Sequence, residues 1–101
     1  MKAKAAPSGT ALLKKVREHV KKGTYILVKH ALERQKERSI RLPDVLYVLE
    51  HGRHEQEKDE YNLKMQAWKH AIRGTTVNRV DLRIIVAFQI EMVIITVMKV
   101  D

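Results

Sequence analysis

The stretch Leu82-Arg-Ile-Ile-Val-Ala-Phe88, followed after a short connection by Met92-Val-Ile-Ile-Thr-Val-Met98, decides the fold of this chain. Every second residue from Leu82 to Phe88 is large and apolar, which is the period of a β-strand. The second run is apolar on both faces until Lys99. Strands that are covered on both faces belong at the centre of a sheet, so we expect these two runs to form that centre.

Three helical segments precede these strands. The first is expected between Thr10, an N-cap residue, and Gly23, a typical helix end, because apolar residues recur between them at helical spacing. The second is expected over residues 30–38. The third begins at Pro43, a residue suited to the first helical turn, and ends at Gly52.

The other strands are short or polar. Tyr25–Val28 is β-rich and typical of an edge strand, and any strand between His54 and Tyr61 lies at an edge because that segment is polar throughout. Residues from Trp68 to Arg73 alternate, and we expect a loop from Gly74. The order predicts an α+β fold, with N-terminal helices packed on a three- to four-stranded, mainly antiparallel sheet.

Length and composition narrow the class of protein. The chain has 101 residues, enough for one domain, which we expect over residues 10–101 after a flexible basic arm at residues 1–9. The absence of cysteine excludes disulfides, thiol nucleophiles and cysteine zinc sites, and fits a reducing compartment. The apolar run 92–98 is too short to cross a bilayer, and no signal peptide is recognisable. We therefore expect a cytoplasmic protein with no membrane contact.

The charge of the chain is strongly basic and unevenly spread. The net charge is +8, with twelve Lys and Arg against three acidic residues in 1–41, and eight against nine in 42–101. A strongly basic protein favours a polyanionic partner, with nucleic acid ahead of anionic membrane. Ordinary solubility with accidental asymmetry is the alternative interpretation.

His30, Arg34 and Arg38 form the most informative local pattern. Their spacing of i, i+4 and i+8 places them along one side of a helix. Two guanidinium groups in line suit phosphate oxygens, and an imidazole can carry protons near neutral pH. The alternative is a solvated helix whose arginines pair with acidic residues of segment 55–60.

These residue types can support RNA cleavage without a metal. Attack of a 2′-hydroxyl on its own phosphate needs a general base, a general acid and cations around the developing charge. Trp68 and Tyr61 could stack an unpaired base, although a lone Trp on an alternating strand more often packs in the core. Lys99 interrupts the last apolar strand, where it can reach the rim of the sheet or simply enter solvent.

Several other sites are excluded by their missing patterns. His51 and His54, with Glu50 and Glu55 beside them, match no established zinc spacing, so we expect no metal site and no cofactor. The chain contains no P-loop, no G-x-G-x-x-G and no G-x-S-x-G, which closes the kinase, dehydrogenase and serine hydrolase interpretations.

The segment Lys29-His-Ala-Leu-Glu-Arg-Gln-Lys-Glu-Arg-Ser-Ile40 resembles the opening motif H-A-x-x-R-x-x-E-R-G-I of the domain-of-unknown-function family numbered 4258. Ser39 departs from the usual glycine, which predicts a helix end without a left-handed cap, and Gln89–Glu91 is an unusual glycine-free connection. The resemblance covers about residues 13–101. It continues through Asp44-Val45, the L-E-x-G that ends at Gly52, Trp68–Thr75, Leu82–Phe88 and Val93–Val97.

The layout of that family is similar to the BrnT and MqsR toxins, which share the RelE/ParE-like fold and cut messenger RNA. This resemblance implies that basic residues line an RNA groove, with His30 for proton transfer and arginines for phosphate. The implied catalytic residues are His30, Arg34, Arg38 and Lys99. The implied nucleic-acid-binding residues are Lys29, Arg41, Trp68 and Arg73.

The resulting hypothesis is a RelE-like, metal-independent endoribonuclease toxin that binds RNA, free or on the ribosome, and pairs with an acidic antitoxin. The alternative is a non-catalytic nucleic-acid-binding or protein-interaction module. A third possibility is a basic face that docks on an acidic protein surface.

Overall fold

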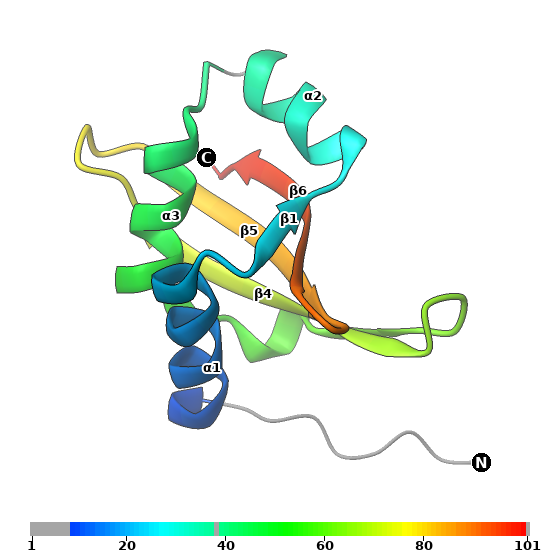
Figure 1. Cartoon of the computed structure of the whole chain (residues 1–101). Coiled ribbons are helices and arrows are strands. Elements are labelled where there is room, and N and C mark those ends of the chain that lie inside the picture. Colours follow the sequence, from blue (N-terminus) through cyan, green and yellow to red (C-terminus); the bar gives the residue numbers. More distant parts are fainter. Residues whose placement is uncertain (1–8, 38, 101) are drawn as a thin grey trace.

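A computed structural model describes residues 9–37, without the side chain of Glu37, and residues 39–100. The N-terminal part is mainly helical and the C-terminal part is a sheet (Figure 1). The helices are α1 (Gly9–Lys22), α2 (Lys29–Glu37), α3 (Leu42–His51) and the single 3-10 turn η1 (Gln56–Lys58). The strands are β1 (Tyr25–Leu27), β2 (Arg53–His54), β3 (Glu60–Asn62), β4 (Ala67–Thr75), β5 (Asp81–Phe88) and β6 (Met92–Lys99).

The predicted helices are present with small shifts at their ends. Helix α1 begins at Gly9, one residue before the expected Thr10, and the rest of the predicted arm lies outside the described residues. Arg38 also lies outside them. Asp44 stabilises the first turn of α3, because its carboxylate accepts the Arg41 backbone N–H at 3.0 Å. Among the described residues, no helix has the length and apolar character needed to cross a membrane.

The sheet has the order β1-β6-β5-β4-β2, and β3 also pairs with β4. Only the β1–β6 pair is parallel. The α+β class and the mainly antiparallel sheet are therefore confirmed, and β5 and β6 lie inside the sheet as expected. The expected count of three to four strands is wrong, because the polar segment 53–62 supplies two short edge strands and the sheet has six in all.

The loop expected at Gly74 is also wrong, since β4 continues through Gly74 to Thr75. This glycine serves a close approach between two elements. A Cβ at Gly74 would lie 3.1 Å from the Gly52 Cα and 3.1 Å from a methyl carbon of Val48. The end of α3 can therefore pack directly on β4.

One face of the sheet carries the core. Helices α1 and α3 cover it (Figure 1). Burial of apolar surface on this face is the main favourable contribution to folding. The largest fully buried side chains are Leu12 and Val16 from α1, Val45, Val48 and Leu49 from α3, and Ile72, Leu82, Ile84, Val86, Met92, Ile94 and Val97 from the strands.

The other face of the sheet is partly open. Arg73, Arg83 and Ile85 lie there, at strand positions that alternate with the buried core residues. A bulge between β5 and β6 pairs Ile85 with Thr96 but Val86 with Ile94, which leaves Ile95 as the extra residue. Helix α2 packs against β6 and borders the open face of the sheet along that strand.

Helix α2 is followed by a left-handed residue, in contrast to the expectation from the missing glycine. Ser39 has φ of 55°, and the Ile40 N–H donates to the Gln35 carbonyl at 2.9 Å. Ser39 therefore adopts the left-handed conformation that glycine usually has at a helix end, although its side chain makes this conformation sterically unfavourable.

The substitution Ser39→Gly should raise the free energy of unfolding by about 1 kcal/mol, because glycine adopts positive φ without that penalty. Urea unfolding of the two proteins measures the difference. Ala11→Gly, in the exposed face of α1, is the control and should lower stability by about 1 kcal/mol. A loss of stability in Ser39→Gly would contradict the assigned backbone conformation.

Candidate functional site

A hollow of about 450 Å³ lies between the start of α2 and the open face of the sheet, and is called the His30 hollow below. Its floor comes from β5 and β6, including Ile85, Thr96 and Met98. Its charged wall brings together residues from five elements. These residues are His30 from α2, Lys58 from η1, Glu60 from β3, Lys69 from β4 and Arg83 from β5.

His30 is exposed at the rim of this hollow and is held by its helix neighbour. The Arg34 Nε–H donates to His30 Nε2 at 3.4 Å, as expected for residues four positions apart. Because the Arg34 N–H donates to Nε2, that nitrogen carries the lone pair, and the proton of the neutral His30 ring is on Nδ1. A bond of this length is weak.

Glu55 joins two arginines on the open face. Arg73 and Arg83 are direct neighbours across β4 and β5, a placement that repels when uncompensated. The Glu55 carboxylate, 5% exposed, accepts the Arg83 Nε–H at 2.5 Å and an Arg73 N–H at 3.1 Å. Asp81 accepts two further N–H groups of Arg73, at 2.9 and 2.6 Å. The four side chains form one neutralised network.

The network shifts the pKa values of its members. The Arg83 guanidinium holds the pKa of Glu55 below its ordinary value, although burial opposes this shift. The bond to Asp81 in the same way raises the pKa of Arg73. Since Glu55 occupies Nε and Nη2 of Arg83, the remaining Nη1 group points along the floor, 4.0 Å from the Met98 sulfur. Arg83 is thus held in place beside the hollow, with its charge shared with Glu55 and its Nη1 group donating a weak hydrogen bond to the Met98 sulfur.

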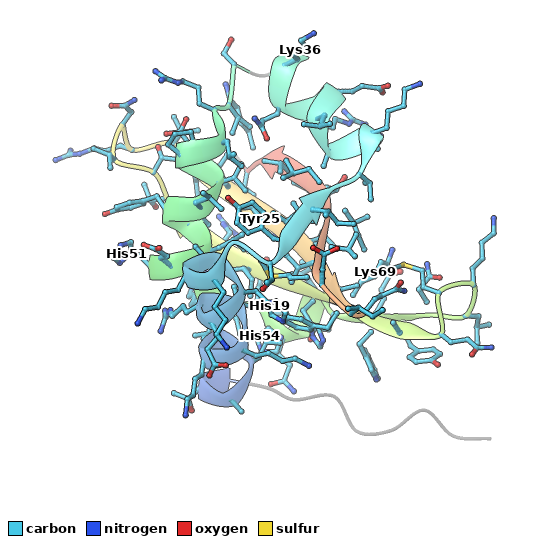
Figure 2. The ribbon with its side chains drawn as sticks, viewed as in Figure 1. His19, Tyr25, Lys36, His51, His54 and Lys69 are labelled. Carbon is cyan, nitrogen blue, oxygen red and sulfur yellow. The ribbon has the colours of Figure 1, made fainter. Side chains whose placement is uncertain are left out.

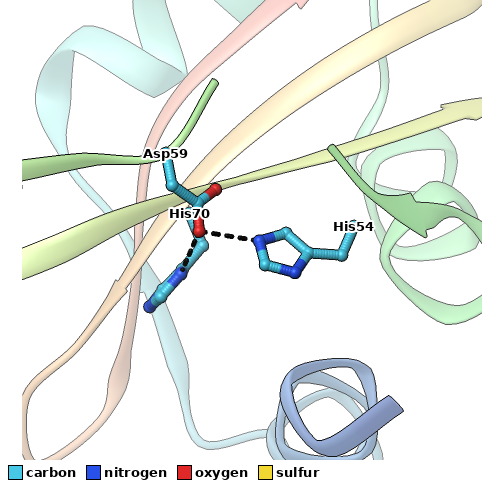
Figure 3. Close-up of side chains that lie close together, drawn as sticks. All are labelled: His54, Asp59 and His70. Atoms are coloured by element: carbon cyan, nitrogen blue, oxygen red, sulfur yellow. Dashed lines mark hydrogen bonds and ion pairs between the residues drawn. The ribbon is translucent and has the colours of Figure 1, made fainter. Parts of the chain in front are cut away.

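A second cluster, His54, Asp59 and His70, lies in the interior beside α1 (Figure 3). The Asp59 Oδ2 atom is 2.7 Å from His54 Nε2 and 2.8 Å from His70 Nδ1. Asp59 Oδ1 accepts the Ala71 backbone N–H at 3.0 Å. This bond replaces a ladder bond, because η1 interrupts the edge between β2 and β3 opposite Ala71. We name these three side chains the histidine cluster.

The histidine cluster differs from the grouping that the sequence brings together. His51 points away from His54 (Figure 2) and its side chain is 59% exposed, 3.8 Å from Glu50. Glu55 belongs to the arginine network instead. Burial lowers the pKa of His70, and the hydrogen bond to Asp59 opposes that shift. His54 is therefore the one histidine of the discounted group that lies in a cluster of potential ligands.

The structure divides the predicted residues of α2 between two surfaces. His30 lines the His30 hollow, and Arg34 contacts it. Lys29 and Arg41 line a separate groove of about 660 Å³ between α2 and the start of α3. Of the acidic residues in segment 55–60, Glu55 binds Arg73 and Arg83, Asp59 binds His54 and His70, and Glu60 lies 3.8 Å from Lys69.

The predicted residues of the strands are also separated. Trp68 packs against Tyr61 across the β3–β4 pair, with ring centroids 5.7 Å apart, on the opposite side of β4 from Lys69. Arg73 lies on the open face but its charge is compensated. Lys99 is exposed at the end of β6, one residue beyond Met98 of the hollow.

Sequence reasoning missed Lys58, Lys69, Arg83 and Glu55. Strand alternation offered one signal, because Arg83 interrupts an otherwise apolar face at positions 83, 85 and 87. The register that places Arg73 opposite Arg83 depends on the turn between the strands, and the spacing of His54, Asp59 and His70 matches no ligand pattern.

A family model described as a domain of unknown function, DUF4258, matches residues 27–99. The chain belongs to this family. The segment that matches DUF4258 contains every residue of the His30 hollow, of the arginine network and of the histidine cluster, whereas α1 precedes it. No curated protein and no solved structure matches this DUF4258 chain.

Glu55→Gln should lower the free energy of unfolding by about 2 kcal/mol at pH 7, because it leaves two adjacent arginines without their shared anion. The pKa of Glu55 is depressed in the folded state, so its contribution is present above the ordinary pKa of 4.5 and is lost as pH falls through the lower folded value. Urea unfolding from pH 7 to pH 3 should therefore show the difference between the two proteins shrinking.

Glu57→Gln is the matched control, because Glu57 is exposed on η1 two residues away. It should leave stability unchanged at both pH values. A Glu55→Gln difference that is as large at pH 3 as at pH 7 would contradict the arginine network.

Proposed function

We propose that this protein is a metal-independent endoribonuclease of the RelE-like type, the toxin of a toxin–antitoxin pair, and that RNA binds in the His30 hollow. The observation that carries the proposal is the meeting of His30 with Lys58, Lys69 and Arg83 from three other elements. The excess of basic residues supports a polyanionic substrate. The α+β layout, with helices on one face of a mainly antiparallel sheet, supports the comparison with RelE-like toxins.

The chemistry needs only the groups at this hollow. His30, through the lone pair on Nε2, takes the proton of the 2′-hydroxyl, and that oxygen attacks the adjacent phosphorus. The bond to the 5′-oxygen breaks, and an ammonium group of the hollow supplies its proton. Arg83 and the lysines stabilise the charge that develops on the phosphate oxygens. Arg34, released from His30, provides a further phosphate contact.

The other candidate residues have outer roles in this proposal. Arg38, outside the described residues, keeps its predicted role in phosphate binding, and Lys99 at the end of β6, with Lys29 and Arg41, would contact flanking phosphates. Trp68 and Arg73 would act only on RNA that reaches beyond the hollow. An acidic antitoxin would cover the hollow by charge complementarity. A messenger-RNA substrate would require the protein to act in the cytoplasm.

A non-catalytic nucleic-acid-binding module is the second candidate. It is favoured by the bond from Arg34, which occupies the lone pair of His30, and by the compensated charge of Arg73. Binding by counterion release would then affect RNA and DNA alike and weaken steeply with salt.

The test uses metal-free protein in excess EDTA, shown to be folded, with mixed-sequence single-stranded RNA. His30→Ala and Lys69→Ala should each reduce the rate of mapped cleavage by at least about 100-fold. His51→Ala is the control, because it removes an exposed histidine on α3, outside the hollow. Its cleavage rate should equal that of the parent.

Binding without cleavage, with equal affinity for RNA and DNA, would favour the second candidate. Cleavage that survives in His30→Ala would contradict the proposed site. Neither cleavage nor binding would contradict both nucleic-acid functions.

A further inference from the structure

The Asp59 carboxylate is buried without a permanent cation. Its side chain is 6% exposed, and its three hydrogen-bond donors are His54, His70 and the Ala71 amide. Within residues 9–37 and 39–100, no Lys or Arg lies within ion-pair distance of it. Neutral donors offset only part of the free energy of burying a charge, so this position favours a cation.

The surrounding atoms are a ligand set for a transition metal. The His54, Asp59 and His70 side chains are 3%, 6% and 3% exposed, and their three ligand atoms lie within 4.8 Å of one another. Two imidazoles and one carboxylate, without thiolates, suit Zn²⁺ and similar divalent ions better than Mg²⁺ or Ca²⁺. We propose that the histidine cluster binds one divalent transition-metal ion, with Zn²⁺ as the preferred class.

Coordination of one ion would require the ligand atoms to move: the two carboxylate–nitrogen distances lengthen, and the two nitrogens, now within 4.8 Å of each other, must reach the same spacing. Zn²⁺ bonds to nitrogen and oxygen are about 2.0–2.2 Å long, so ligand atoms on one tetrahedral ion lie roughly 3.3 Å apart. The nitrogen atoms of His54 and His70 are now 2.7 and 2.8 Å from Asp59 Oδ2. The ion would replace the two bridging protons and separate these atoms by about half an ångström. The Ala71 amide on Oδ1 already orients the carboxylate from outside the ligand shell.

Metal binding would break a hydrogen bond at the start of α1. The Gly9 N–H now donates to His54 Nδ1 at 3.1 Å, which fixes the ring proton on Nε2. Coordination through Nε2 moves that proton to Nδ1, so the Gly9 contact must open. Metal binding therefore exchanges three hydrogen bonds, the two between Asp59 and the histidines and the one from Gly9, for three coordinate bonds, and the Gly9 amide becomes a reporter of binding.

The test is titration of the tag-free, EDTA-stripped full chain with Zn²⁺ by calorimetry, and with Co²⁺ by absorption. We expect one ion per chain with micromolar or tighter affinity, a tetrahedral Co²⁺ spectrum, and a shift of the Gly9 amide in NMR spectra. Asp59→Asn and His70→Ala should weaken binding at least tenfold. His51→Ala and His30→Ala, which remove histidines outside the cluster, should leave it unchanged.

If the cluster variants fail to fold, X-ray absorption of the Zn²⁺-loaded parent protein still tests the proposal. It should show two imidazoles among nitrogen and oxygen ligands. Absence of one-to-one binding in the parent, or binding that depends on His51 or His30, would overturn the proposal. Because the histidine cluster shares no residue with the His30 hollow, its outcome is independent of RNA cleavage.

Discussion

The buried carboxylate of Glu55 is the interaction on which the open face of the sheet depends. The register of β4 and β5 places Arg73 directly opposite Arg83, and two adjacent cations on a half-buried surface repel. Glu55 contacts both, and its own N–H donates to the Ala71 carbonyl of β4 at 2.8 Å. One residue thus joins the edge segment to β4 and β5 and fixes Arg83 beside the hollow.

Asp59 has the corresponding role a few residues later. The edge segment cannot continue as a strand through η1, so the Ala71 N–H lacks a backbone partner, and the Asp59 carboxylate supplies one. The same carboxylate orients His54 and His70. Glu55 and Asp59 both lie in the polar segment between β2 and β3. The polarity of this segment has a physical reason. Its side chains serve hydrogen bonds and ion pairs at the sheet edge more than they serve the apolar core.

The parts of the fold that depend on local pattern were predictable from the sequence. The periodicity of Leu82–Phe88 and the glycine and proline signals of the helices located the central strands and three helices. The two-residue strand β2 and the left-handed Ser39 were not, because they depend on tertiary contacts and on the exit path of α2. His30 was identified from its helical spacing with Arg34. Lys58, Lys69 and Asp59 were not, because only strand register and the η1 interruption bring them to their partners.

The central proposal is that single-stranded RNA binds mainly in the His30 hollow, while Lys29 and Arg41 of the separate groove contact only flanking phosphates. The most direct measurement is NMR titration of the isotope-labelled chain with a short 2′-O-methyl RNA, which can bind but cannot be cleaved. The account predicts shifts of the backbone amides of His30, Lys69 and Arg83, with the groove of Lys29 and Arg41 much less affected. Shifts confined to that groove or to α1, or no shifts at low salt, would contradict it.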